Sequence, residues 1–197
     1  MPSQDLRQAL RKDIRSRRRS LSQEQQIHAA NMLCQRFISS PAFSGAQHIA
    51  LYLPVDGELD TLPLIEACWR AGKNVYLPVI HPFSPGNLLF LHYRNDSQMV
   101  ANRYGIPEPK LDIRDVLPPQ QLDLIGTPLV AFDNRGQRLG MGGGYYDRTL
   151  APWFATGMGA RPVGIAHDCQ QVDQLPSEIW DVPLPEIITP SRHWQWN

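Results

Sequence analysis

The sequence has few cysteines, no long apolar segment and no secretory signal. The three cysteines, Cys34, Cys68 and Cys169, are too few and too scattered for a disulfide framework or a clustered metal site. No apolar run approaches the roughly 20 residues that a membrane-spanning helix needs. The arginine-rich start is not followed by the apolar stretch of a secretory signal. These absences predict a cytoplasmic protein that makes no contact with a membrane.

Charge of the two signs is balanced, with 19 Lys and Arg residues against 19 Asp and Glu residues. A balanced chain is not a general binder of nucleic acid, so any basic feature has to be local. The 197 residues suffice for one buried core, and no internal repeat or low-complexity linker divides them. We therefore predict a single domain over residues 1–197, and we expect it to act as a monomer.

Two amphipathic helices open the chain. The first is expected to run from an N-cap at Ser3 to about Arg19. The second starts with the capping-box pattern of Ser22 and Gln25 and ends before Pro41.

Short apolar runs then alternate with helical patterns. The expected strands are 48–53, 75–80, 88–93, 124–132, 162–166 and 186–189, and the expected helices are 61–71 and 145–153. This alternation predicts an α/β fold in which helices cover both faces of a mostly parallel sheet. Ligands bind beyond the carboxyl ends of such strands, so the informative loops follow Leu53, Ile80, Phe132 and Ala166.

The strongest local signal is a glycine-rich turn between an apolar strand and a helix. Four of the five residues 140–144 are glycine, which lets backbone N–H groups close on an anion. The helix that follows adds its own free N–H groups and the positive end of its dipole. Arg138 and Arg148 flank the turn with positive charge. We interpret the turn as a phosphate site; the alternative is a structural glycine turn.

Two carboxylates are candidates for a magnesium site beside these phosphates. Asp147 lies one helical turn beyond the glycines, and Mg²⁺ prefers one or two carboxylates together with phosphate oxygens and water. The alternative is an ordinary acidic residue in the first turn of a helix. Asp181, on a late loop, is the second candidate.

The first helix carries seven basic side chains in residues 1–20. Arg7, Arg11 and Arg15 share one helix face because they are four residues apart. Three explanations compete: a solvated face, which fits residues 17–19 best; nucleic-acid contact, which the balanced charge and the lack of interleaved aromatic residues disfavour; and arginines that reach the phosphates of the glycine turn. We favour the third for Arg7 and Arg11.

An acidic loop follows the first strand and contains Asp56, Glu58 and Asp60. Thr61 is the expected N-cap of the next helix, and Asp60 shares that capping role. Glu58 has no evident structural role, so we predict that it hydrogen-bonds the amino and imino groups of a heterocyclic substrate. His167, at the end of strand 162–166, is more often a structural than a catalytic residue in such a position.

Taken together, these segments resemble the 5-formyltetrahydrofolate cyclo-ligase family, also called 5,10-methenyltetrahydrofolate synthetases. The resemblance spans nearly the whole chain and includes the first helix, the loop 52–58, the segments 69–73 and 127–133 and, most specifically, the segment 138–147. It implies a three-layer α/β sandwich with a Rossmann-like sheet. It also implies that ATP and 5-formyltetrahydrofolate give 5,10-methenyltetrahydrofolate, ADP and phosphate through a phosphorylated formyl intermediate, with Mg²⁺ as cofactor.

The resemblance further implies which residues form the site. Contacts to ATP fall on Arg7, Arg11, Arg138, Leu139, Gly140, Met141, Gly142, Gly143, Gly144, Tyr145 and Tyr146. Contacts to the folate fall on Arg11, Leu53, Glu58, Met141, Gly142, Gly143, Gly144 and Tyr145. Magnesium falls on Asp147 and Asp181, and the catalytic residues are Arg138 and Tyr145. Such a site matches the chemistry, because phosphoryl transfer needs positioning and charge more than a protein nucleophile.

The chain departs from the family pattern in two places. Many members carry basic residues where Met141 and Gly143 stand here, and many have Lys where this chain has Arg7. Loss of basic residues from the turn leaves an alternative function, a folate- or nucleotide-binding protein without turnover.

Overall fold

The computed structural model describes residues 2–178 and 181–196 of the chain. Its α-helices are α1 (Pro2–Arg19), α2 (Gln23–Ile38), α3 (Pro41–Gly45), α4 (Leu62–Arg70) and α5 (Tyr145–Thr156). Its strands are β1 (His48–Ala50), β2 (Asn74–Ile80), β3 (Leu88–His92), β4 (Met99–Ala101), β5 (Pro107–Pro109), β6 (Val116–Leu117), β7 (Leu124–Pro128), β8 (Ala131–Phe132), β9 (Arg138–Leu139), β10 (Arg161–Ile165), β11 (Glu186–Ile188) and β12 (His193–Gln195). Short 3₁₀ turns lie at Ile113–Asp115, Pro119–Gln121 and Asp168–Gln170.

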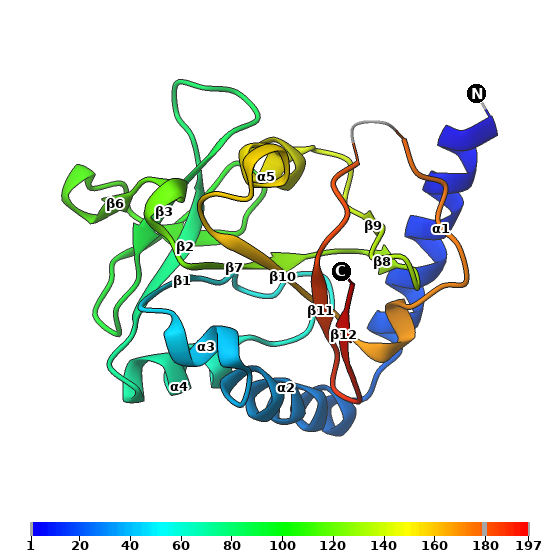
Figure 1. The fold of residues 1–197 in the computed structure, drawn as a ribbon, viewed down its shortest axis with the longest axis horizontal. Coiled ribbons are helices and arrows are strands. Elements are labelled where there is room, and N and C mark those ends of the chain that lie inside the picture. Colours follow the sequence, from blue (N-terminus) through cyan, green and yellow to red (C-terminus); the bar gives the residue numbers. More distant parts are fainter. Residues whose placement is uncertain (1, 179–180, 197) are drawn as a thin grey trace.

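The centre of the molecule is an eight-stranded sheet in the order β12-β11-β10-β7-β1-β2-β3-β6. The five strands from β11 to β2 are parallel to their neighbours, whereas β12, β3 and β6 pair antiparallel at the two edges. Helices α2, α3 and α4 cover one face and α5 lies on the other (Figure 1). The predicted α/β sandwich with a mostly parallel sheet is therefore confirmed.

Apolar side chains fill both faces of this sheet. Leu33 and Phe37 of α2 pack with Leu64 and Ile65 of α4 on one face. Leu150 of α5 belongs to the cluster on the other face. Burial of these helix stripes is what stabilises the layers.

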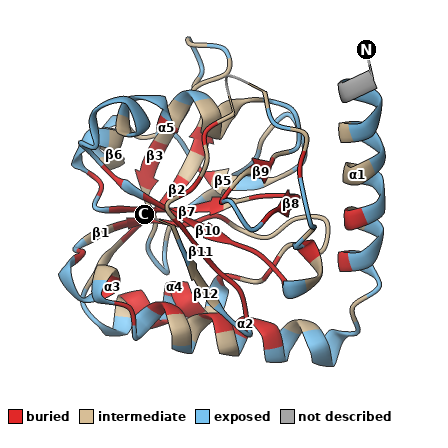
Figure 2. Ribbon diagram, turned by 45° about the vertical axis from the view of Figure 1, so that its right-hand side comes forward, coloured by how far each residue is buried: buried red, intermediate tan, exposed pale blue. Residues whose placement is uncertain are grey.

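Helix α1 lies beside the sandwich rather than within it. Figure 2 shows it along one side of the molecule, and among the residues whose burial is described the buried ones lie in its C-terminal half. Ile14 is fully buried in a small separate cluster with Val130, Leu139 and Leu175. The first helix is thereby attached next to the segment that carries the glycine turn.

The expected strand 124–132 is wrong as a single element. After β7 the chain leaves the main sheet, and β8 pairs antiparallel with β9 in a two-stranded ribbon. Asp133 closes this ribbon, because its side chain accepts hydrogen bonds from the backbone N–H of Arg135 at 2.9 Å and of Leu175 at 3.0 Å. The ribbon carries Arg138 out of the sheet toward α1 and α5.

Several expected boundaries also shift. Helix α1 begins at Pro2, so Ser3 lies inside it and not at its N-cap. The capping box of Ser22 and Gln25 is present as predicted. Thr61 precedes α4, but its hydroxyl donates to the carbonyl of Tyr52 instead of capping the helix.

Asp60 has the capping role in the α4 turn, since its Oδ1 accepts from the N–H of Leu62 at 2.9 Å. Within the described residues, no helix is both long enough and apolar enough to cross a membrane.

Candidate active site

The glycine turn connects β9 to α5 and approaches two other segments closely. Gly142 and Gly144 have φ values of 99° and 67°, which favour glycine because a Cβ would be strained there. Gly144 is the N-cap of α5 and Tyr145 is its first residue. The backbone N–H groups that have no partner within α5 therefore start at Gly144, the last glycine of the turn.

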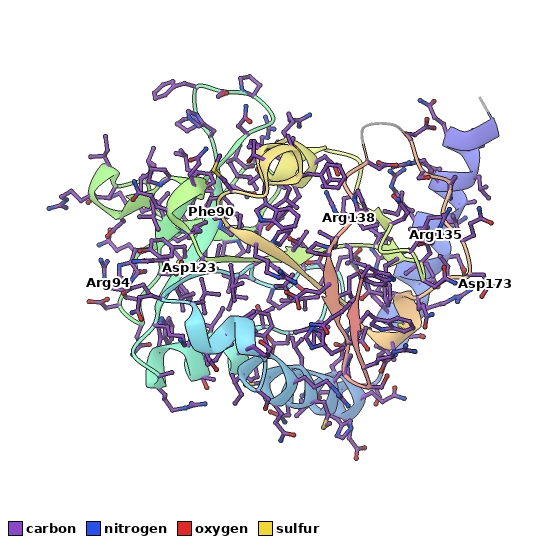
Figure 3. All side chains as sticks on the ribbon, viewed as in Figure 1. Phe90, Arg94, Asp123, Arg135, Arg138 and Asp173 are labelled. Atoms are coloured by element: carbon purple, nitrogen blue, oxygen red, sulfur yellow. The ribbon has the colours of Figure 1, made fainter. Side chains whose placement is uncertain are left out.

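Arg138 enters the site from β9 and is almost completely buried. Its Nη2 donates to Oδ1 of Asp147 in α5 at 2.5 Å, and its Nε is buried without a hydrogen-bond partner among the described residues. Burial lowers the pKa of Arg138, and the Asp147 carboxylate opposes that shift. In Figure 3 Arg138 lies on the side of the molecule that carries α1. The next residue, Leu139, belongs to the buried cluster that contains Ile14 of that helix.

Arg11 of α1 contacts the glycine turn directly. Its Nε donates to the carbonyl of Gly140 at 2.8 Å, and a Cβ placed on Gly142 would lie 3.6 Å from its Nη2. Arg11 also lines an open hollow of ≈ 520 Å³ with Lys12, Arg15 and Met141. Helix and turn thus meet where the sequence predicted that they would share a ligand.

Arg7, one helical turn earlier, pairs with Asp181 instead of the glycine turn. Its two terminal nitrogens donate to the two carboxylate oxygens at 2.6 and 2.9 Å, and Nη1 also donates to the carbonyl of Pro176. The hydrogen bond to Asp181 is the main cause of the raised pKa of Arg7, and the negative charge of Asp147 adds to it. The pair Arg7–Asp181 consequently lies near the pair Arg138–Asp147.

The two candidate magnesium ligands differ in how far they are already engaged. Asp147 binds Arg138 through Oδ1, and its second oxygen has no hydrogen bond in the described part of the chain. Asp181 accepts from Arg7 with both oxygens and from the N–H of Glu178 at 2.8 Å.

The described residues contain no cluster of three or more His, Cys, Asp or Glu side chains arranged to hold a metal. A magnesium ion that takes most ligands from phosphate and water fits Asp147. It fits Asp181 only if Arg7 is released.

Glu58 reaches the same region from the loop after β1. Its Oε2 accepts from the N–H of Val55 at 3.1 Å, and burial raises its pKa. After burial itself, the charge of Glu58 is the next cause of the raised pKa of Tyr146 in α5. Leu53 packs against the core cluster on the α2 and α4 face. The predicted folate residue Glu58 therefore faces the helix that follows the glycine turn.

Tyr145 contacts two residues that the sequence did not indicate, Arg103 and Tyr104. Its hydroxyl lies 3.4 Å from that of Tyr104 and accepts from Arg103, and these contacts lower its pKa. Arg148 holds the turn from the other side, with hydrogen bonds to the carbonyls of Gly143 and Gly86. Arg103 and Tyr104 lie in the loop between β4 and β5, and no local pattern in the sequence relates this loop to α5.

The end of the first helix is not the solvated face expected for residues 17–19. Arg17 fits that expectation, since it is exposed and pairs with Asp13. Arg18 contradicts it, because its side chain is fully buried. Arg19 and Arg15 both pair with Asp56 in the loop after β1.

Comparison with known proteins places this geometry in a family. A sequence model described as the 5-formyltetrahydrofolate cyclo-ligase family matches residues 3–190. The chain belongs to that family. A 5-formyltetrahydrofolate cyclo-ligase from Escherichia coli strain K12 is 58% identical over 185 residues, which span 93% of this chain and 100% of the relative. One from Haemophilus influenzae is 50% identical, over 92% of this chain and 96% of the relative.

Two solved structures with the same fold are named as 5,10-methenyltetrahydrofolate synthetases. The 5,10-methenyltetrahydrofolate synthetase of Aquifex aeolicus superposes with a TM-score of 0.83 at 29% identity, covering 96% of this chain and 92% of the other. That of Mycoplasma pneumoniae gives a TM-score of 0.73 at 27% identity, covering 93% and 98%. The family resemblance drawn from the sequence is therefore confirmed, and the site described above belongs to a fold shared with these enzymes.

Proposed function

We propose that the protein is an enzyme that converts 5-formyltetrahydrofolate into 5,10-methenyltetrahydrofolate and consumes ATP. Membership of the cyclo-ligase family favours an enzyme over a binding protein without turnover. The observation that carries the proposal is the meeting of Arg11, Arg138 and the glycine turn at the start of α5. Backbone N–H groups and guanidinium charge at one place are what a triphosphate requires.

The reaction that the family resemblance implies has two steps. The formyl oxygen attacks the γ-phosphorus of ATP, and ADP leaves with the bonding electrons. N10 of the folate then attacks the formyl carbon, the C–O bond to phosphate breaks, and N10 loses its proton. Arg138 and the turn at 140–144 would hold the transferring phosphoryl group, and Arg11 would hold the phosphates from the α1 side. The protein contributes positioning and charge neutralisation.

The folate is proposed to bind between the loop after β1 and the start of α5. Glu58 and Leu53 would contact the pterin end, while Tyr145 and the inner turn, Met141 to Gly144, would contact the atoms that react. Arg7, Leu139 and Tyr146 would line the ATP side. Arg138 and Tyr145 are the residues that we assign to catalysis, because both flank the turn at which we propose that the two substrates meet.

Magnesium is proposed to bind Asp147 together with the phosphates of ATP. When bound, it would neutralise charge on those phosphates. Asp181 becomes a second ligand only if Arg7 turns from its carboxylate to the nucleotide. Without such a turn, the role of Asp181 is to hold Arg7 in place.

We further propose that residues 1–197 act as one domain and as a cytoplasmic monomer that binds no nucleic acid. Balanced charge supports the last point, and a central sheet that carries most of the helices supports the first.

The test is an absorbance time course with the purified protein and 5-formyltetrahydrofolate. We expect methenyltetrahydrofolate to accumulate only when Mg·ATP is present, with one ADP formed per product. Tight folate binding without product would favour the non-catalytic alternative and direct attention to Met141 and Gly143. Product without ATP consumption would contradict the assignment of the turn to phosphate.

A further inference from the structure

The turn that carries Glu58 has an unusual backbone. Asp56 and Gly57 both have positive φ values, 56° and 74°, and the N–H of Glu58 donates to the carbonyl of Val55 at 3.0 Å. Among the described residues, Asp56 is the one non-glycine residue with a positive φ. A side chain in this region is disfavoured, so contacts from elsewhere have to hold the turn.

Arg18 of α1 supplies these contacts. Its side chain is fully buried, its Nε donates to the carbonyl of Asp56 at 2.8 Å, and its Nη2 lies 3.1 Å from Oδ2 of the same residue. A Cβ on Gly57 would come within 3.3 Å of Cγ and of the carbonyl oxygen of Arg18. Arg18 therefore packs along the turn and also pairs with the carboxylate of Asp56.

The remaining nitrogen of Arg18 is directed to Glu58 without a hydrogen bond. Nη1 is buried, has no hydrogen-bond partner in the described part of the chain, and lies 3.8 Å from Oε1 of Glu58. The other carboxylate oxygen of Glu58 accepts from Val55. The charge of Arg18 also acts on His167, which is buried and interacts with the backbone of Gly57 in the same turn. Buried donors left unpaired in this way are uncommon and often mark functional sites.

We propose that Arg18 is a positioning residue for folate binding: it fixes the turn 55–58 and keeps the carboxylate of Glu58 charged and aimed at the pterin ring. The inference rests on the proposed function, in which Glu58 accepts hydrogen bonds from the amino and imino groups of the heterocycle. An ionised carboxylate accepts two such bonds, whereas a protonated one has a donor in place of one acceptor. Arg18 touches no substrate in this scheme and acts through Glu58.

The charged groups around Glu58 determine how its binding should depend on pH. Arg18 and Arg15 face it from α1, Asp56 from its own turn, Tyr52 from the segment after β1 and Tyr146 from α5. Burial raises the pKa of Glu58, and Arg18 is the largest influence in the opposite direction. Loss of Arg18 raises the pKa of Glu58 further. When the solution is acidified, Glu58 is then protonated at a higher pH, and folate binding is lost at that higher pH.

The experiment compares Arg18→Met with Arg17→Met across pH. Arg17 is on the same helix but exposed, and it pairs with Asp13 rather than with the turn. For Arg18→Met we expect the KM for 5-formyltetrahydrofolate to rise at least tenfold while the KM for ATP stays within about twofold. The acidic limb of kcat/KM for the folate should move to higher pH by about one unit. Arg17→Met should match the unmodified protein, and Glu58→Gln gives the effect of losing the carboxylate altogether.

Equal changes in the two KM values, or an acidic limb that does not move, would overturn the proposal. Circular dichroism and the melting temperature establish whether Arg18→Met is folded. If it is not, Arg18→Lys decides the matter, because lysine keeps the charge but cannot contact the turn and Glu58 at once. For Arg18→Lys we expect the KM for the folate to rise about threefold while the acidic limb of kcat/KM stays at the same pH. An unchanged KM for the folate overturns the proposal. Failure of the proposed function itself is separate, since the unmodified protein would then form no product.

Discussion

Two buried arginines stand out at the scale of single residues. Arg138 and Arg18 are both almost inaccessible to solvent, and each is held by a carboxylate of another segment. A buried charge that loses its partner is strongly destabilising, because the desolvated ion remains without compensation. Both residues therefore serve stability as well as the proposed site, and substitutions must be chosen to separate the two.

Comparison of Asp147→Asn with Asp112→Asn separates the effect on stability from the effect on the proposed site. Asp147 and Asp112 each lie 2.5 Å from an arginine and have similar exposure, 29% and 34%, but their partners Arg138 and Arg114 are 3% and 85% exposed. We expect Asp147→Asn to cost about 1–3 kcal/mol of stability, to lower kcat roughly 10- to 100-fold and to raise the Mg²⁺ concentration needed. Asp112→Asn should change none of these. Urea unfolding and a magnesium titration of the rate make the comparison, and a normal magnesium dependence would remove Asp147 from the metal site.

The buried side chain of His167 should make the free energy of unfolding depend on pH. The side chain is buried, and burial lowers its pKa to about 4. An unfolded histidine titrates near 6.5, so the stability that neutral His167 provides is complete above that pH and is lost as pH falls toward 4.

We expect this residue alone to reduce the free energy of unfolding by about 2 kcal/mol between pH 7 and pH 5. His167→Gln should flatten that part of the profile in urea unfolding at the two pH values. An unchanged slope would mean that the pKa of His167 in the fold stays near that of an unfolded histidine.

At the scale of elements, the ribbon β8–β9 positions the site. The turn between its strands contains Gly136, which has a φ of 78° and lies so close to the loop before β11 that a Cβ would be 2.6 Å from the carbonyl oxygen of Leu184. Arg138 follows two residues later. The sequence could not indicate this arrangement, because the run 124–132 is apolar nearly throughout and only the hairpin pairing of β8 with β9 shows that the strand is interrupted.

Gly136→Ala tests the ribbon, with Gly72→Ala as its control. Gly72 has a similar φ of 69°, but a Cβ added there would have no neighbouring atom within 4 Å among the described residues. Both changes carry the strain of a left-handed alanine, about 1 kcal/mol. Gly136→Ala should cost about 1–3 kcal/mol more, since backbone has to move, and it should lower kcat by displacing Arg138. Equal melting temperatures for the two variants would show that the ribbon adapts freely.

At the scale of the whole molecule, the sequence predicted what is periodic and missed what depends on distant pairing. The layers, the capping box and the glycine turn follow from local patterns, and all are present. The strands β4, β5, β6, β9 and β12 were missed because two or three residues are too few to show an alternating pattern. The burial of Arg18 was missed for a different reason: nothing in a run of arginines distinguishes the one that a left-handed turn will enclose.

The attachment of α1 gives the last prediction. The helix touches the sandwich through one small cluster and a few ion pairs, while Arg11 reaches the glycine turn. A nucleotide bound at that turn therefore links α1 to the rest of the molecule. At a free nucleotide concentration 100 times its Kd, binding should raise the free energy of unfolding by about 2.7 kcal/mol.

Arg11→Met should keep the melting temperature of the free protein and lose most of the increase that Mg·ATP causes. Lys12→Met removes a neighbouring charge that lines the same hollow, and it should retain the increase. If both variants lose the increase in melting temperature equally, ATP binding depends only on the overall positive charge of the helix. The contact of Arg11 with Gly140 then has no specific role in binding.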